Sequence, residues 1–314
     1  MWNQIVMTLL TMLMFSFVYA VVATIAAFMG IEGFLFYGVL AFVIMFVQYM
    51  IGPKMVEWTM GVRYVSEKEA PKLHQMVAEL AEKAGIKKPK VAISEMRMPN
   101  AFAFGRSRGD GRICVTRGIL DTMNEDELRA VIGHEMSHIK NRDVLFITLL
   151  SVIPMIFWFI FRGSLYSSGR NKGGAVLIGV AAFFIYFITN LIVLFASRFR
   201  EYHADKGSVN LGNKPNVMAT ALYKLVYGSA KTSRDDLQKV QGLKAFFVND
   251  PSKAMRDFSE LKVLDRDMSG TIDKSELENI RNSQVKLGKI DRFMEIYSTH
   301  PNMLKRIQRL SKLA

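Results

Sequence analysis

The chain has 314 residues, of which 50% are hydrophobic, and its formal net charge is +13. Its single cysteine excludes an intrachain disulfide and a cysteine-based zinc site. Such a positive charge is also found in nucleic-acid-binding proteins, but the sequence has no nucleic-acid motif, so attraction to anionic lipid headgroups explains it more simply.

The N-terminal region predicts a transmembrane hairpin. Two stretches without charged residues, 5–29 and 34–51, are joined by Gly30–Gly33. Each is close to the ~20 residues that cross a hydrocarbon core of ~30 Å. The first stretch lacks a basic segment before it and is too long for the core of a signal peptide, which favours a retained span. We therefore assign residues 1–53 to an N-terminal transmembrane hairpin.

Residues 54–143 predict the first half of an extramembrane domain that contains a helix and a small sheet. Apolar residues at helical spacing predict an amphipathic helix over residues 66–86. Three short apolar or alternating runs predict strands at Lys90–Ser94, Ala101–Phe104 and Arg112–Thr116. A glycine-rich segment joins the last two as a hairpin turn. Phe102 and Phe104 share one face of their strand and are expected to fill the core.

A candidate metal site follows in the segment H-E-M-S-H at residues 134–138, within a helical run. Four residues make about one helical turn, so His134 and His138 project from one face and can bind a single Zn²⁺. Glu135 is then placed to take a proton from the attacking water. Asn124 and Glu127 form a capping pair that predicts the start of this helix. The alternative is a pair of unconnected surface histidines on an amphipathic helix.

A second pair of apolar stretches, residues 144–161 and 175–197, predicts another hairpin, either fully or partly embedded in the membrane. The helix with the two histidines runs into the first stretch, and the second stretch runs out into an acidic segment. Both parts of the metal site are therefore expected at the same end of this hairpin, just outside the bilayer. We assign residues 144–197 to the second hairpin and residues 198–314 to the second half of the extramembrane domain.

The acidic segment offers a third metal ligand. Glu201 can complete a His₂Glu site that keeps a fourth position open for water, as catalytic zinc sites do. Asp205, one turn later, can accept the outer N–H of a ligand imidazole. The E-x-x-x-D spacing is common on solvated helices and becomes significant only beside H-E-x-x-H. His203, between the two carboxylates, is expected to lie off the zinc-facing side.

Residues 265–276 match the 12-residue calcium loop of an EF-hand, with Gly270 at position 6 and Ile272 at position 8. The candidate oxygen ligands are Asp265, Asp267, Ser269, Thr271, Asp273 and Glu276. EF-hands usually work in pairs, and the sequence contains no second loop. Ca²⁺ binding, weak binding and a loop that no longer binds therefore all stay open.

Several motifs together resemble the HtpX-like family of membrane-bound zinc metalloproteases, relatives of the CAAX prenyl endopeptidases. They are H-E-M-S-H, S-R-F-R-E-Y-H-A-D at 197–205, P-N-A-F-A-F-G at 99–105 and T-H-P at 299–301. The resemblance implies a gluzincin-type zinc protease domain. It implies that His134, His138 and Glu201 bind zinc and that Glu135 is the catalytic base.

The resemblance also implies how substrate is bound. Residues Asn100–Phe104 would form an edge strand that receives the peptide through main-chain hydrogen bonds. The expected substrate-binding residues are Asn100, Ala101, Phe102 and Ala103. His300 would donate a hydrogen bond to the oxyanion that forms on the attacked carbonyl, although a lone distant histidine is more often structural.

Basic residues set the expected orientation in the membrane. Those near the span ends on the zinc side are Lys54, Arg63, Arg129, Lys140, Arg142, Arg198, Arg200 and Lys206. The opposite side has only Arg162, Arg170 and Lys172. The positive-inside rule therefore places both chain ends and the active site in the cytoplasm.

The sequence thus predicts a mainly α-helical, multi-pass protein of the cell membrane with two transmembrane hairpins and a small β-sheet. Its expected activity is that of a zinc endopeptidase that hydrolyses membrane or misfolded proteins at the cytoplasmic face, in protein quality control. A CAAX-type prenyl protein protease is the nearest alternative enzyme, although four spans are few to enclose a large chamber. A non-enzymatic calcium-responsive membrane sensor is the alternative of another class, against which the intact Glu135 argues. The expected partners are polypeptide substrates and the lipid bilayer, and the oligomeric state stays open.

Overall fold

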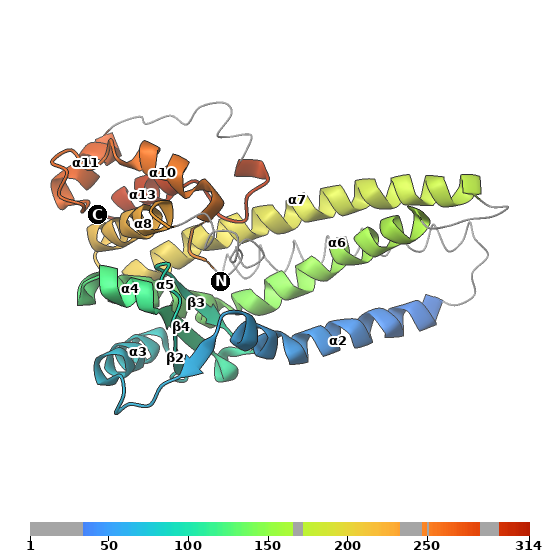
Figure 1. Cartoon of the computed structure of the whole chain (residues 1–314), viewed down its shortest axis with the longest axis horizontal. Helices are drawn as coiled ribbons and strands as arrows, with labels where there is room; N and C mark the ends of the chain where they lie inside the picture. Colours follow the sequence, from blue (N-terminus) through green and yellow to red (C-terminus); the bar gives the residue numbers. More distant parts are fainter. Residues whose placement is uncertain (1–33, 166–171, 233–246, 250, 283–294) are drawn as a thin grey trace. The chain divides into compact units, whose positions relative to one another are not determined.

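The described part of the chain is mostly helical and contains a small mixed sheet (Figure 1). The computed structural model describes residues 34–165, 172–232, 247–249, 251–282 and 295–314. The predicted span over residues 5–29 lies outside the described residues. The chain divides into two compact units: one comprises Met1–Ile51 and Leu145–Ala196, and the other comprises Gly52–Val144 and Ser197–Ala314.

The first unit contains parts of three long helices, α2 (Phe34–Thr59), α6 (Asp143–Leu165) and α7 (Lys172–Asn210). Aromatic rings join α6 to α7. The ring centroids of Trp158 and Tyr186 are 5.2 Å apart, as are those of a neighbouring phenylalanine pair. Such offset aromatic pairs stabilise helix contacts beyond their burial alone.

One stretch of the described residues, Val176–Asn210 in α7, is long and apolar enough to cross a membrane. Large apolar side chains on it are exposed, including Leu177 at 73% and Phe184 at 60%. A core helix of a soluble protein would bury such side chains, so their exposure is the pattern expected of contact with lipid.

The second unit contains the sheet, in the spatial order β1 (Val62–Tyr64), β2 (Lys90–Ser94), β4 (Arg112–Thr116) and β3 (Ala101–Phe104). β2 and β4 are parallel, and the two outer strands are antiparallel to their neighbours. The three predicted strands are confirmed, and β3 lies at an edge. β1 was not predicted, because its three residues are too few to establish an alternating pattern.

Capping residues define the helices that flank the sheet. α3 (Pro71–Ala84) starts with proline in its first turn and ends at Gly85, whose φ of 66° suits glycine. α5 (Glu125–Asn141) starts with the predicted capping box, in which the Asn124 side chain accepts from the Glu127 N–H and the Glu127 side chain accepts from the Asn124 N–H. Such a cap typically contributes about 1 kcal/mol.

α5 lies at the centre of this unit, where it contacts α3, β3, β4 and α8 (Pro215–Ala230). α8 in turn packs against α10 (Ala254–Leu261), α11 (Lys274–Asn282) and α13 (Met303–Ser311). The short elements are α4 (Arg117–Thr122), η1 (Arg108–Asp110) and η3 (Pro251–Lys253). Because α5 is covered on several sides, several of its polar residues, among them His134 and Glu135, are buried and need partners.

Candidate active site

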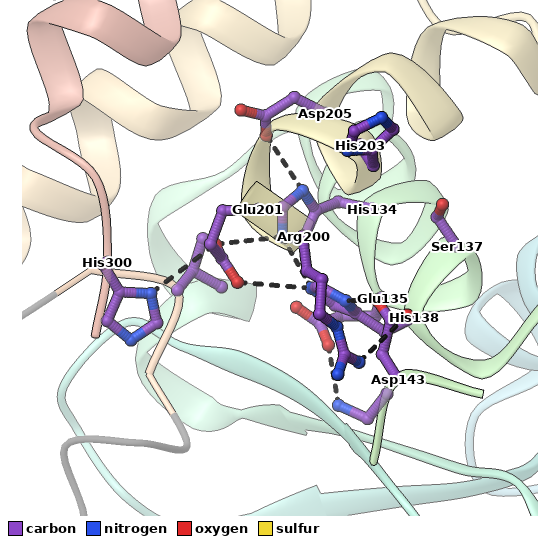
Figure 2. A network of polar contacts seen from close by, with 12 residues as sticks. His134, Glu135, Ser137, His138, Asp143, Arg200, Glu201, His203, Asp205 and His300 are labelled. Atoms are coloured by element: carbon purple, nitrogen blue, oxygen red, sulfur yellow. Dashed lines mark hydrogen bonds and ion pairs between the residues drawn. The ribbon is translucent and has the colours of Figure 1, made fainter. Parts of the chain in front are cut away.

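The structure brings His134, His138 and Glu201 together (Figure 2). Both histidines project from the same side of α5, and Glu201 reaches them from α7. The two Nε2 atoms are 3.2 Å apart. Glu201 Oε2 lies 3.6 Å from Nε2 of His134, and Oε1 lies 3.5 Å from Nε2 of His138. Three candidate ligand atoms from two helices thus face one point.

This donor set fits a zinc ion. Two nitrogens bound tetrahedrally at ~2.0–2.1 Å would be separated by about 3.3–3.4 Å, close to the observed 3.2 Å. Glu201 is only 7% exposed, and its Oε2 accepts no hydrogen bond from the described residues, although Arg306 Nη1 lies 3.2 Å away. A buried carboxylate whose two oxygens face the Nε2 atoms of His134 and His138 provides the environment that a divalent cation would satisfy.

Glu135 lies between this donor set and the edge strand. Its Oε2 accepts a 2.7 Å hydrogen bond from the Ala103 backbone N–H of β3. Burial raises the pKa of the Glu135 carboxyl, because the charged form loses water, although His138 and His134 act in the opposite direction. A carboxyl with a raised pKa is better suited to take and return a proton near neutral pH.

His134 contacts a second carboxylate through its other ring nitrogen. Nδ1 lies 2.9 Å from Asp205 Oδ1, an ion-pair distance, although this nitrogen has no hydrogen-bond partner among the described residues. Arg306 of α13 donates two hydrogen bonds to the same carboxylate, from Nε at 2.9 Å and from Nη2 at 2.7 Å. Arg306 is fully buried, and the attraction of Asp205 raises its pKa despite the opposing effect of burial. The guanidinium therefore remains charged and holds Asp205 in place.

Three residues near the site were not predicted to contribute to it: Arg306, Asp143 and Arg200. Arg306 carried a signal that could have revealed it, because it falls on the apolar face of α13 with Met303 and Leu310. A charged residue on such a face needs a buried partner. Asp143 lies 2.6 Å from Nδ1 of His138 and contacts Arg200.

His300, predicted to be catalytic, lies beside Glu201, whereas the predicted substrate-binding residues lie in or just before the edge strand. His300 Nδ1 lies 3.5 Å from Glu201 Oε2, and neither of its ring nitrogens has a hydrogen-bond partner among the described residues. Ala101 and Phe102 are buried in the edge strand, and Phe102 packs in a core cluster with Phe104, as predicted.

The Asn100 side chain makes a contact within the protein: it is fully buried, and its Oδ1 accepts a hydrogen bond from the Val248 N–H at 3.1 Å. Its backbone N–H and carbonyl both pair with Thr116. Asn100 therefore anchors the start of β3. His203 Nδ1 lies 2.9 Å from the Phe199 carbonyl oxygen, in agreement with its expected place off the zinc-facing side.

The EF-hand-like loop is a second group of carboxylates. Oxygens of Asp265, Asp267 and Glu276 all lie within 4.8 Å of one another. The loop is closed by backbone donors: the Gly270 N–H binds Asp265 at 3.0 Å and the Arg266 N–H binds Glu276 at 2.7 Å. Gly270 has a φ of 78°, which suits the glycine expected at position 6.

The buried His134, the half-buried His138 and a glutamate around one point, with a further glutamate beside an edge strand, define a metal-dependent peptidase. Residues 67–314 match the model of peptidase family M48. "Protease HtpX homolog" of Methanothermobacter thermautotrophicus is 54% identical over 70% of this chain and 84% of its own length. "Protease HtpX homolog" of Thermoplasma acidophilum is 33% identical over 95% of this chain and 92% of its own length.

The crystal structure of S. mikatae Ste24p has a similar fold, with a TM-score of 0.51 at 15% identity over 99% of this chain and 67% of that one. The chain belongs to peptidase family M48. It is a membrane-bound, zinc-dependent metalloprotease.

Proposed function

We propose that the enzyme cleaves membrane or misfolded proteins at the cytoplasmic face of the membrane, with His134, His138 and Glu201 as its zinc ligands. The observation that carries this proposal is the hydrogen bond between the Ala103 N–H of the edge strand and Glu135, which lies beside the three ligands. It supports a site where an extended chain added to β3 has its carbonyl next to a base. Zinc bound there would polarise the scissile carbonyl and lower the pKa of a water molecule.

Side chains and backbone groups of the protein perform the proton transfers, stabilise the oxyanion and bind the substrate. Glu135 takes the proton of the attacking water and returns it to the leaving amine. His300, buried beside Glu201, donates a hydrogen bond to the oxyanion that forms on the substrate carbonyl. The outer edge of Ala101–Ala103, anchored by Asn100, holds the peptide backbone. A structure of the Glu135→Gln variant with a bound peptide tests this strand, and a peptide located elsewhere would reject it.

Substrate class can be tested with purified full-length protein in detergent. We expect it to digest casein and an unfolded membrane-protein fragment at several sites, because binding through backbone groups does not require a particular modification. A farnesylated C-terminal peptide should be cleaved no faster than its unmodified form. Cleavage of the farnesylated peptide alone would instead support a prenyl protease.

Orientation can be tested with single cysteines, since the native Cys114 is buried. The crowding of basic residues near the zinc-side span ends supports a cytoplasmic active site. Lys68→Cys, at an exposed position, should resist an impermeant maleimide on intact cells, whereas Ser168→Cys should react. Labelling at position 68 and not at position 168 would invert the proposed orientation.

We further propose that residues 265–276 bind Ca²⁺, although the loop has no EF-hand partner. In paired EF-hands the residue at position 8 bonds to the partner loop. Here the Thr220 hydroxyl of α8 takes that place, because it accepts from the Ile272 N–H at 2.9 Å and donates to the Ile272 carbonyl at 3.0 Å. This anchor supports a loop held in shape without a second hand.

Calorimetry on the full-length protein tests the calcium site. Ca²⁺ should bind to the wild type, and Glu276→Gln should weaken binding by an order of magnitude or more, because it removes a charged bidentate ligand. Glu278→Gln, a nearby exposed carboxylate, is the matched control and should bind as the wild type does. Absence of Ca²⁺ heat at millimolar ion, or an unchanged signal in Glu276→Gln, would reject the site.

A further inference from the structure

His138 has a carboxylate of its own, distinct from the one that contacts His134. Asp143 Oδ2 lies 2.6 Å from Nδ1 of His138, the ring nitrogen that faces away from the other candidate ligands. The second oxygen of Asp143 lies 2.9 Å from Nη2 of Arg200. Asp143 and Arg200 are each only 6% exposed. Figure 2 shows His138, Asp143 and Arg200 as one connected group beside Glu201.

A sharp turn of the backbone produces this contact. α5 ends at Asn141, and Arg142 adopts the left-handed conformation with φ of 58°, while its N–H bonds to the carbonyls of His138 and Ile139. A side chain five residues after His138 would point away from it on a continuous helix. The turn at Arg142 instead brings Asp143 back onto the imidazole. Asp143 is also the first residue of α6, where the helix dipole favours a negative charge.

The group repeats the arrangement at the other imidazole. His134 contacts Asp205, which Arg306 holds, and His138 contacts Asp143, which Arg200 holds. In both cases one carboxylate contacts a ring Nδ1 and a guanidinium. The two oxygens of Asp143 are divided between His138 and Arg200, whereas Oδ1 of Asp205 contacts both His134 and Arg306 and Oδ2 accepts from Arg306. The two arginines come from different elements, α13 and α7, so the repetition does not follow from a shared local motif.

We propose that Asp143 and Arg200 are positioning residues for the zinc site. Asp143 accepts the Nδ1–H of His138, which fixes the tautomer whose Nε2 has a free lone pair for the metal and makes that nitrogen more basic. Arg200 contacts the second oxygen of Asp143 and thereby orients the carboxylate toward His138. The proposal rests on the proposed role of His138 as a zinc ligand.

Stability alone is a weak reason to bury this ion pair. Removing two charges from water costs several kcal/mol per ion, and apolar residues of similar volume often do as well or better. A buried carboxylate that contacts a candidate metal ligand can instead orient that ligand for metal binding. Asp143 begins the apolar helix α6, and Arg200 follows the apolar part of α7. The pair therefore connects His138 to the first turn of one apolar helix and to the end of the apolar part of the other.

Zinc affinity of the purified full-length protein, measured by competition with a chelator, tests the proposal. Asp143→Asn should weaken zinc binding about 10–100-fold, and Arg200→Met should weaken it in the same direction by less. Adding Arg200→Met to Asp143→Asn should cause little further loss, since Arg200 acts through Asp143. Arg200→Lys should recover part of the affinity. Asp126→Asn, an exposed carboxylate on α5, is the matched control and should bind zinc as the wild type does.

Two further measurements separate positioning from a merely structural role. The absorption spectrum of the Co²⁺-substituted protein should change in Asp143→Asn, because the geometry of His138 changes. A purely structural role would lower the thermal midpoint of the metal-free protein and leave both the zinc dissociation constant and this spectrum at their wild-type values, and that result would overturn the proposal. If Asp143→Asn does not fold, the milder Arg200→Lys variant is judged by the same two readouts.

The failure of this proposal and that of the proposed ligand set are distinguishable. Loss of zinc in His138→Ala together with unchanged affinity in Asp143→Asn rejects only the positioning role. Full zinc affinity in His138→Ala rejects the ligand assignment and, with it, the role of Asp143.

Discussion

Replacing Glu135 by glutamine is expected to reduce kcat by about 10²–10⁴-fold, the usual contribution of a general base. The substitution preserves the volume of a side chain that is only 4% exposed, and the amide oxygen can still accept the Ala103 N–H. The amide cannot take a proton from water. Because Glu135 is not among the three candidate ligands, the variant should retain its zinc.

Cleavage of a fluorescent reporter, with zinc content measured on the same sample, checks this expectation. Glu82→Gln provides a matched control, since Glu82 is an exposed carboxylate of α3 away from the site. The control should cleave at the wild-type rate. A zinc-loaded Glu135→Gln variant that cleaved equally fast would show that another group is the base.

Replacing Glu201 by alanine should remove the zinc itself. The change takes away one of three ligands and leaves two histidines, which bind the ion too weakly to survive washing with a chelator. Zinc content should fall from about one per chain to near zero, and proteolysis should fall with it. Full zinc retention in Glu201→Ala would require the third ligand to lie elsewhere.

Asp205 lies one helical turn after Glu201 and is the carboxylate to compare with it. Its ion pair with Arg306 determines which variant is suitable. Asp205→Ala would leave the fully buried Arg306 without its bidentate partner, and breaking a buried ion pair costs about 3–5 kcal/mol. Asp205→Asn preserves the shape and can still accept hydrogen bonds. It should keep zinc with an affinity about 10–100-fold lower. Loss of zinc equal to that of Glu201→Ala would make Asp205 a direct ligand.

Local patterns predicted much of the second unit. The capping pair Asn124 and Glu127 forms the box that the sequence indicated, and the three predicted strands have the expected bounds. These features depend on neighbours in the chain, so the sequence carries them directly. The triad was also recognisable, because one-turn spacing places His134 and His138 on the same side of α5.

Contacts made through tertiary packing were not predictable in the same way. Arg306 reaches Asp205 across 101 residues, which no local pattern specifies. The contact between Asp143 and His138 is close in sequence, but it depends on the left-handed conformation of Arg142, which is uncommon for a residue other than glycine. For Arg306, a charged residue on an apolar helix face was the visible signal, whereas its partner was not. Asp143 carried no such signal, because it ends the polar run at residues 140–143.

The central claim is that this chain is a zinc-dependent peptidase, and removal and return of the metal test it most directly. Purified full-length protein should contain about one zinc per chain and digest casein. Chelation should abolish both, and one equivalent of Zn²⁺, but not Ca²⁺ alone, should restore digestion. Metal-free protein, verified by elemental analysis, that digests casein at the original rate would contradict the claim.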